Sequence, residues 1–411
     1  MRVGLISINS HTKVLNFASP LHTYAFQQFL FANGIDNVII DYEPCYRGAL
    51  DIRHPYDYWM EHPSSNEKKQ KANEKTWKLL YKDREERFDK FQKFIDDNYV
   101  QTKECYTQEK LDEKDVGCDI YMCVTDVIWK YNPNNGFDRG FFLACKTMEG
   151  KGKIAYAASR GVKGYTIEQA LEVNGYLSSF NYIACREKSL ADFVNKQTTS
   201  KASIVLDPVF LQPRDFYEKM CIEPEEKDYI LIYAVMEKAG SLVEEALRLA
   251  KEKNMVVVDI SDDKTILYHS PNGERITKYN IGVEEWLGYL KNASYIFTNS
   301  FHCCCFSIIF NKEFYVGKRN GDKVDFVLQL FGLSWRRIQK GMKYDQKRID
   351  YGPINALKEQ YVEQSKKFVL EAIRRTAEEC EKPRTFLKKL FFRKKRLTGI
   401  EKFENVKQVK N

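Results

Sequence analysis

Short apolar runs alternate with longer stretches in which apolar residues recur every three or four positions. In the first half of the chain, six runs have the length and character of buried strands: Val3–Ile8, Asn37–Asp41, Asp119–Val124, Lys153–Ala158, Tyr182–Cys185 and Ser203–Leu206. The segment Pro20–Ala32 has the helical periodicity. This alternation predicts an α/β fold, with a parallel sheet that is covered by helices on both faces.

Residues 63–115 have a different character. They are dense in Lys, Glu and Asp, and aromatic residues such as Trp77, Phe88 and Phe94 recur among the charges. This pattern predicts a charged insertion of one or two amphipathic helices, which we expect to pack on the first domain by a single apolar stripe.

The alternation stops after Pro208 and starts again near Tyr229. The polar stretch from 213 to 227 shows neither a strand nor a long helix, and a second series then follows: Tyr229–Val235, a helix over 241–253, Met255–Ile260, a helix near 283–291, and Ser294–Thr298. We therefore expect one domain over 1–215 and another over 225–380, closed by a helix over 355–379. Two doubly wound domains bind ligands at the carboxyl ends of their strands, so we expect the site in a cleft between them.

The chain of 411 residues contains 11 cysteines, three of them adjacent at Cys303, Cys304 and Cys305. An odd number without a Cys-x-x-Cys pair indicates free thiols in a reducing compartment. The N-terminus lacks the pattern of a signal peptide, and no apolar run is long enough to span a bilayer. We therefore expect a cytoplasmic protein, and the spacing of the six histidines predicts no metal site.

The formal net charge of +8 is concentrated in residues 381–411, which hold eleven Lys or Arg and three Glu. Residues 1–380 are formally neutral, so the sequence predicts no nucleic-acid partner. Apolar residues such as Phe386 and Phe391 lie among the basic residues of this tail. It has the composition of a segment that binds an anionic membrane surface, although a solvated tail has a similar composition.

Two strand ends carry candidate chemistry. Thr298-Asn299-Ser300-Phe301-His302 joins an apolar strand to a buried helix, which places His302 in the first turn, where free amides favour an anion. His302 is either a proton-transfer residue or a structural histidine. Arg186 follows the strand 182–185, where its guanidinium could grip a carboxylate or a phosphate, or form a surface pair with Glu187. Thr125-Asp126 and Ser159-Arg160 also follow strands and are polar where the cleft is expected.

Taken together, these segments resemble the polysaccharide pyruvyl transferase family. Six segments match family motifs in chain order: Asn16–Ala25, Asp119–Trp129, Ile154–Ser159, Cys185-Arg186-Glu187, Val205–Leu211 and Thr298–His302. The resemblance implies two facing Rossmann-like domains, as in glycosyltransferases of the B type, with phosphoenolpyruvate as the donor and no cofactor or metal. It also implies a pyruvate ketal on a sugar of a surface or capsular polysaccharide, or of its lipid-linked precursor.

The family's cleft arginine and histidine fall on Arg186 and His302. The resemblance implies that Arg186 binds the donor and that His302 acts as an acid or base. Six further residues are expected to line the cleft and bind substrate, together with Asn16 of the first loop: Thr125, Asp126, Ser159, Arg160, Asn299 and Ser300.

The sequence departs from the family pattern at three positions of the expected cleft. Val127 stands in place of Gln, Ala18 replaces a loop Gly, and Cys303 replaces the Gly after His302. Two alternatives therefore stay open: a glycosyltransferase that uses a nucleotide-sugar, and a family member without catalytic activity. No Gly-x-Gly-x-x-Gly or Walker loop is present to favour nucleotide binding.

Overall fold

The computed structural model describes most of the chain. The described residues are 1–8, 11, 15–46, 51–54, 67–162, 164–235, 240–261, 275–319, 321–339, 341–344 and 347–381. The basic tail predicted over 381–411 lies outside them except for its first residue.

The first domain is built on a seven-stranded parallel sheet with the strand order β3-β2-β1-β4-β5-β6-β7. Its strands are β1 (Val3–Ile6), β2 (Asn37–Tyr42), β3 (Gln101–Tyr106), β4 (Ile120–Val124), β5 (Gly152–Ala158), β6 (Tyr182–Cys185) and β7 (Ala202–Ile204). The central strands β1, β4 and β5 are buried along their whole length, as apolar runs covered on both faces must be. The chain order reverses at β1, which is the doubly wound arrangement.

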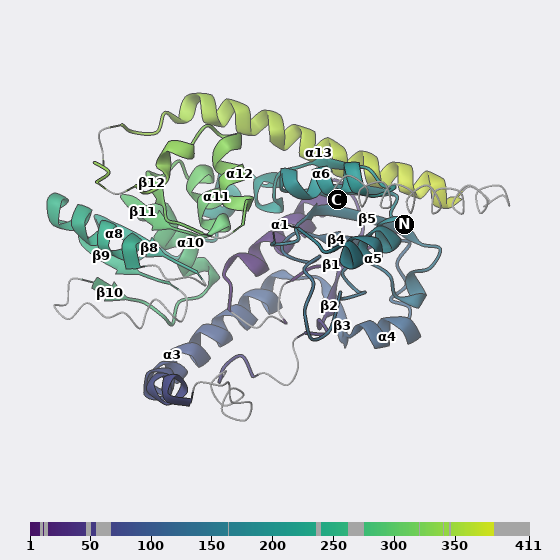
Figure 1. The fold of residues 1–411 in the computed structure, drawn as a ribbon, viewed down its shortest axis with the longest axis horizontal. Helices are drawn as coiled ribbons and strands as arrows, with labels where there is room; N and C mark the ends of the chain where they lie inside the picture. The colour runs from purple at the N-terminus through teal and green to yellow at the C-terminus, as the bar shows by residue number, and fades with distance from the viewer. Residues whose placement is uncertain are drawn as a thin grey trace, which may run out of the picture.

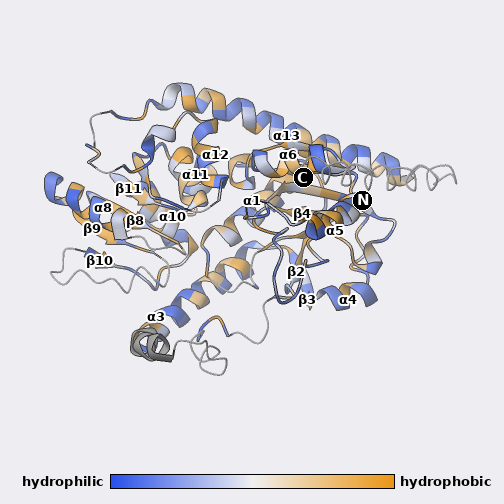
Figure 2. Ribbon diagram, in the orientation of Figure 1, coloured by the Kyte–Doolittle hydropathy of each residue, from blue (hydrophilic) through white to orange (hydrophobic). Residues whose placement is uncertain are grey.

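Helices cover this sheet on both sides (Figure 1). They are α1 (Ala18–Ala32), α4 (Gln108–Glu113), α5 (Ile167–Leu177) and α6 (Lys188–Gln197), with short 3-10 turns at η1 (Lys146–Met148) and η2 (Pro208–Leu211). Helices α3 (Glu67–Asn98) and α7 (Arg214–Glu218) instead contact α10 (Val283–Asn292) of the second domain. The hydropathy colouring shows apolar and polar positions mixed along these helices (Figure 2), whereas every residue of β4 and β5 is buried.

Strand β3 corrects the prediction that residues 63–115 form only helices. Its sequence, Gln-Thr-Lys-Glu-Cys-Tyr, is largely polar because it lies at the edge of the sheet, where only one neighbour covers it. Hydrophobic runs identify buried strands, so an exposed edge strand gives no such signal.

The second domain has a five-stranded parallel sheet with the order β10-β9-β8-β11-β12. Its elements are β8 (Tyr229–Tyr233), α8 (Gly240–Lys253), β9 (Val256–Asp259), β10 (Arg275–Thr277), α10 (Val283–Asn292), β11 (Tyr295–Thr298), α11 (Phe301–Ile309), β12 (Phe314–Val316), α12 (Lys323–Leu330), η3 (Ser334–Arg336) and α13 (Tyr351–Glu381). The order again reverses at its first strand, so both domains are Rossmann-like, as predicted.

Helix α13 crosses from the second domain to the first (Figure 1). Near its start, the hydroxyl of Tyr351 donates a hydrogen bond of 2.5 Å to the carbonyl of Lys312. Toward its end, Val369, Ala372 and Ile373 are buried in the core of the first sheet. The assignment of this closing helix to the second domain alone is therefore incomplete, because its C-terminal half covers the first sheet.

Helix α3 also touches both domains, which the predicted single stripe on the first domain does not describe. Arg84 donates from Nη1 to the hydroxyl of Tyr279 at 2.5 Å, and the ammonium of Lys90 lies 2.6 Å from a carboxylate oxygen of Glu285. A helix fixed to both domains resists their relative movement.

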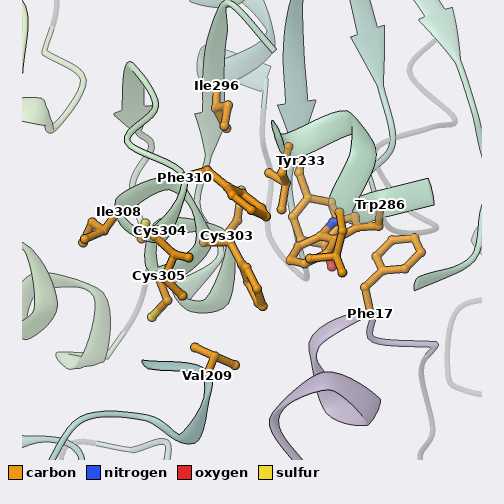
Figure 3. Packing of buried hydrophobic residues seen from close by; sticks show 14 of the residues in the cluster. Phe17, Val209, Tyr233, Trp286, Ile296, Cys303, Cys304, Cys305, Ile308 and Phe310 are labelled. Atoms are coloured by element: carbon orange, nitrogen blue, oxygen red, sulfur yellow. The ribbon is translucent and has the colours of Figure 1, made fainter. Parts of the chain in front are cut away.

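The interface between the domains is an apolar core. The ring of Phe17, just before α1, stacks on Trp286 of α10 with centroids 5.6 Å apart, and Tyr233 meets the same indole edge-on at 5.5 Å (Figure 3). The three adjacent cysteines Cys303, Cys304 and Cys305 are buried in this core together with Val209 of η2. No helix among the described residues combines the length and the apolar character that a membrane span requires.

Candidate active site

The site is assembled from strand ends of both sheets. Thr125 and Asp126 follow β4 directly, and their φ angles of 40° and 62° place both in the left-handed region. Such a conformation is costly for residues other than glycine and persists where the surroundings impose it. Here the amide of Thr125 donates to the carbonyl of Tyr156 and the amide of Ser159 to that of Asp126, which fixes both side chains in the site.

Arg186, at the end of β6, lies between two buried carboxylates. Its Nη2 lies 2.9 Å from Oδ1 of Asp126, and its Nη1 lies 2.9 Å from Oδ2 of Asp207. The guanidinium also lies over the ring of Phe301, with Cζ 4.5 Å from the ring centroid. Nε of Arg186 also lies 3.7 Å from a carboxylate oxygen of Glu187, so the expected pair forms, but both residues are buried and the pair is not at the surface.

Both Nη atoms of Arg186 are already paired with carboxylates, which changes the role expected of this residue. Arg186 does not line the pocket described below, whereas Asp126 does. In this structure the arginine therefore positions two carboxylates, and other cations face the pocket. The hydroxyl of Thr125 donates to the same oxygen of Asp207 at 2.8 Å and completes the network.

His302 faces this network from the second domain. Its Nε2 lies 3.5 Å from Oδ2 of Asp207, which is longer than a well-formed hydrogen bond. The ring of the buried His22, from α1, lies with its centroid 5.5 Å from that of His302. Two imidazoles, one from each domain, thus meet beside one carboxylate.

Burial and neighbouring charges shift the pKa values of these groups in different directions. Burial alone would raise the pKa of Asp126, but the charges of Arg186 and Lys323 hold it well below the usual range. Likewise burial opposes ionisation of Asp207, and His302 and Arg186 outweigh it, so its pKa is also low. Burial lowers the pKa of His22 to about 4, helped by the neighbouring His302. The two carboxylates are therefore ionised and His22 is neutral at physiological pH.

A pocket of about 50 Å³ opens beside this network, between the domains. Its lining comes from the first domain (Leu15, Asn16, Asp126) and from the second (Tyr233, Val235, Ser300, Phe301, His302, Arg319, Lys323). About 10–15 Å³ suffices for one water molecule, so the pocket has the size of a small polar group.

Two cations line the pocket that the sequence analysis did not name. Lys323 begins α12, and within the described part of the chain its ammonium forms neither an ion pair nor a hydrogen bond. Burial lowers its pKa to about 8, helped by the charge of Arg186, so the ammonium is still largely protonated at neutral pH. Arg319 lines the same pocket and donates from Nη1 to the carbonyl of Asn299 at 3.1 Å.

Ser300 and Asn299 have separate roles. Ser300 caps α11, as predicted, because its hydroxyl accepts from the amide of Cys303 at 3.4 Å, and it lines the pocket. The side chain of Asn299 accepts from the amide of Val235 at 2.8 Å. Asn299 therefore fastens the strand end of β11 to the segment after β8 and does not itself line the pocket.

The three remaining predicted residues differ in whether they line the pocket. Asn16 lines the pocket and its side-chain oxygen accepts from the amide of Ala18 at 3.1 Å, where α1 starts. Ser159 and Arg160 lie in the loop after β5, outside the pocket lining. Nε of Arg160 donates to the carbonyl of Val162 at 3.0 Å, so this guanidinium supports the loop.

The structure thus brings together six predicted residues and adds four. His302, Arg186, Thr125 and Asp126 form the network, and Ser300 and Asn16 join it at the pocket. Asp207 and His22 lay inside matched motifs, in Leu-Asp-Pro and in the first helix, and a search for ionisable residues within those motifs would have found them. Lys323 and Arg319 carried no signal, because the loop that contains them has no recognisable spacing.

Two Rossmann-like domains with a small pocket between them define a two-domain α/β protein, and the pocket is lined by an imidazole, a guanidinium, an ammonium and the carboxylate of Asp126. The sequence profile of the polysaccharide pyruvyl transferase family matches residues 21–316. The chain belongs to this family of transferases, as its motifs predicted.

No curated protein matches the sequence significantly. Among solved structures, the chain is similar to UDP-GlcNAc 2-epimerase from Neisseria meningitidis bound to UDP-GlcNAc, with 11% identity, a TM-score of 0.48 and coverage of 91% of this chain and 100% of that one. It is also similar to UDP-GlcNAc 2-epimerase from Methanocaldococcus jannaschii, with 12% identity, a TM-score of 0.43 and coverage of 88% and 92%.

Proposed function

We propose that this protein transfers the pyruvyl group of phosphoenolpyruvate to two hydroxyls of a sugar and so forms a ketal. The sugar belongs to a surface or capsular polysaccharide, or to its lipid-linked precursor. The observation that carries the proposal is the pocket in which Lys323, Arg319 and His302 meet the N-terminus of α11. Membership of the pyruvyl transferase family supports it.

The pocket is suited to the donor's charge. Phosphoenolpyruvate carries a phosphate and a carboxylate, and each is stabilised by cations and by free amides at a helix N-terminus. Lys323 supplies an ammonium that no described group hydrogen-bonds, although the charge of Asp126 acts on it, and Ser300 caps the amide of Cys303 in the first turn of α11. We assign anion binding to Lys323, Arg319 and this helix terminus.

His302 is the proposed proton donor. Ketal formation adds a proton to the methylene carbon of the donor, which makes the adjacent carbon electrophilic. One sugar hydroxyl then bonds to that carbon, the carbon–oxygen bond to phosphate breaks, and the second hydroxyl closes the ring. One hydroxyl proton replaces the proton that His302 gave, and the other leaves with the phosphate. The reaction balances without oxidation or reduction, so it calls for no redox cofactor.

The carboxylates of Asp207 and Asp126 support this chemistry. Asp207 lies beside His302, with Oδ2 3.5 Å from Nε2, and we assign it the orientation of the imidazole. Asp126 lines the pocket, and we assign its ionised carboxylate the orientation of a sugar hydroxyl, whose hydrogen bond it would accept. Arg186 holds both carboxylates in place, so we assign it a positioning role in place of the donor-binding role first expected.

A lipid-linked acceptor would be met at a membrane surface. The basic and aromatic residues of 381–411 suit an anionic leaflet, so we propose that this tail brings the protein to the cytoplasmic face of the membrane.

The proposal is tested by ligand-induced thermal stabilisation of the purified protein. Phosphoenolpyruvate, UDP-sugars and GDP-sugars are compared on wild type, His302→Ala, Lys323→Met and Lys358→Met. Lys358 is the matched control, because it is a half-buried lysine in a different pocket, with its pKa lowered by burial. A ligand at 100 times its Kd stabilises by about 2.7 kcal/mol.

We expect stabilisation by phosphoenolpyruvate in wild type and Lys358→Met, and its loss in Lys323→Met. Stabilisation by a nucleotide-sugar alone would overturn the donor assignment in favour of a glycosyltransferase. Normal phosphoenolpyruvate binding by Lys323→Met would overturn the pocket assignment. Product formation from a pyruvylatable acceptor then separates an active enzyme from a binding protein.

A further inference from the structure

Four side chains with metal-ligand chemistry meet at the far edge of the first sheet. Asp41 is the last residue but one of β2 and pairs in register with Cys105 of the neighbouring strand β3. Glu43 follows two residues later, and its amide donates to the carbonyl of Tyr106, which continues the pairing. His11, in the segment after β1, completes the group. The sequence suggested no metal site, because these residues come from three separate elements without a spacing motif.

The ligand atoms of His11, Glu43 and Cys105 all lie within 4.8 Å of one another. Nε2 of His11 lies 3.4 Å from Sγ of Cys105 and 2.6 Å from Oδ1 of Asp41. In a tetrahedral zinc site, a sulfur at about 2.3 Å and a nitrogen at about 2.1 Å lie about 3.5 Å apart. The histidine and cysteine are therefore already at the separation that such an ion requires.

We propose that His11, Cys105 and Glu43 bind a zinc-type divalent cation, with a water molecule in the fourth position. The combination of imidazole, thiolate and carboxylate selects zinc over magnesium or calcium, which prefer oxygen ligands alone. The ion would displace the proton that His11 shares with Asp41, and the bound imidazole, thiolate and carboxylate would then carry two negative charges, which match the charge of the ion. All four side chains are only partly exposed, so an ion there would be held at the edge of the fold and not in free solvent.

The site is separate from the pocket but connected to it through the chain. His11 precedes Asn16, which lines the pocket and starts α1, by five residues. A cation that ties His11 to β2 and β3 would anchor the segment that leads into the active site. The bound cation would therefore have a structural role, and its binding does not depend on the proposed reaction.

The experiment uses the full-length protein, stripped with a chelator and titrated with Co²⁺ and then with Zn²⁺. Bound Co²⁺ gives an intense near-ultraviolet absorption only when a thiolate coordinates it, so the spectrum reports the ligand as well as the binding. The variants are Cys105→Ser and Glu43→Gln. Cys221→Ser is the matched control, because Cys221 is also a half-buried free cysteine, and its thiol donates to the carbonyl of Tyr217.

We expect one Co²⁺ per chain with the thiolate band, displaced by Zn²⁺, in wild type and Cys221→Ser. Cys105→Ser should lose the band and weaken Zn²⁺ binding by at least about 100-fold, the upper end of what loss of an outer-shell partner costs. Glu43→Gln should keep the band and bind at least about tenfold more weakly. Absence of the band from folded wild type would overturn the site and leave a plain ion pair between His11 and Asp41. Equal binding by Cys105→Ser and Cys221→Ser would overturn it as well.

Discussion

Nε2 of His302 lies 3.5 Å from Oδ2 of Asp207, and this contact joins the two domains across the candidate active site. Asp207 comes from the end of the first domain, where it also accepts from Nη1 of Arg186 at 2.9 Å, and His302 lies in the first turn of α11 of the second. One carboxylate oxygen thus serves a buried arginine of one domain and an imidazole of the other. Relative movement of the domains would change the environment of both.

Asp207→Asn should reduce both stability and activity. It removes one of the two carboxylates that hold Nη1 and Nη2 of the buried Arg186, and breaking such a pair costs about 3–5 kcal/mol. We expect the free energy of unfolding, measured by urea titration, to fall by about 3 kcal/mol and kcat to fall more than KM rises. Asp192→Asn, on the exposed face of α6, is the control and should change stability by less than about 1 kcal/mol. Equal effects of the two variants would contradict the network.

Lys323 should make donor binding dependent on pH. Its pKa of about 8, lowered chiefly by burial, means that the ammonium is lost as the pH rises through that value. Affinity for phosphoenolpyruvate, measured by calorimetry, should therefore fall between about pH 7 and pH 9. Lys323→Arg stays charged throughout this range and should keep its affinity, whereas Lys323→Met should bind weakly at every pH. A wild-type affinity that is constant from pH 7 to pH 9 would exclude Lys323 as the anion-binding group.

His22 should destabilise the protein in mild acid. Its pKa is about 4 in the folded protein, because the ring is buried, against 6.5 for a solvated histidine, so the unfolded chain binds the proton more readily. Stability is fully present above pH 6.5 and is lost as the pH falls toward 4. The loss at pH 4.5 relative to pH 7 should be about 2–3 kcal/mol smaller in His22→Gln than in wild type. Parallel stability curves for the two proteins would show that His22 titrates normally.

Two glycines in helices should respond in opposite directions to alanine. A Cβ at Gly288 of α10 would lie 1.8 Å from the carbonyl oxygen of Ile222, which is backbone and has no rotamer to change. Gly288→Ala should therefore lower the free energy of unfolding by about 2 kcal/mol or more. Gly175 of α5 is exposed, with no atom within 4 Å of its added Cβ, so Gly175→Ala should stabilise by about 0.5–1 kcal/mol. A stabilised Gly288→Ala would contradict the packing of α10 on the segment before β8.

Truncation after Glu381 should abolish binding to anionic vesicles. The removed segment carries the basic and aromatic residues of the tail, and each basic residue near an anionic surface contributes about 1 kcal/mol. Co-sedimentation at low salt should recover the full-length protein with the vesicles and leave residues 1–381 in solution. Binding should weaken at high salt, because added ions screen these charges. Equal sedimentation of both proteins would show that the tail does not mediate binding to the membrane.

The sequence by itself determined the two parallel sheets, most of their strands and the family. Buried parallel strands such as β4 and β8 are continuous apolar runs, so hydrophobicity along the chain finds them directly. The sequence also placed Arg186 and His302 within their elements, because Arg186 directly follows a predicted strand and His302 lies at the start of a predicted helix. The edge strand β3 escaped because one uncovered side allows polar residues there.

Only the tertiary structure decided what those residues touch. Arg186 could have met a substrate or a carboxylate, and the approach of Asp126 and Asp207 from distant loops settled that it meets carboxylates. Lys323 faces the pocket and α13 covers both domains because of how the sheets pack, and no pattern of neighbouring residues encodes either fact. Periodicity reports which face of an element is buried, whereas the partner across that face is set by packing between elements far apart in the chain.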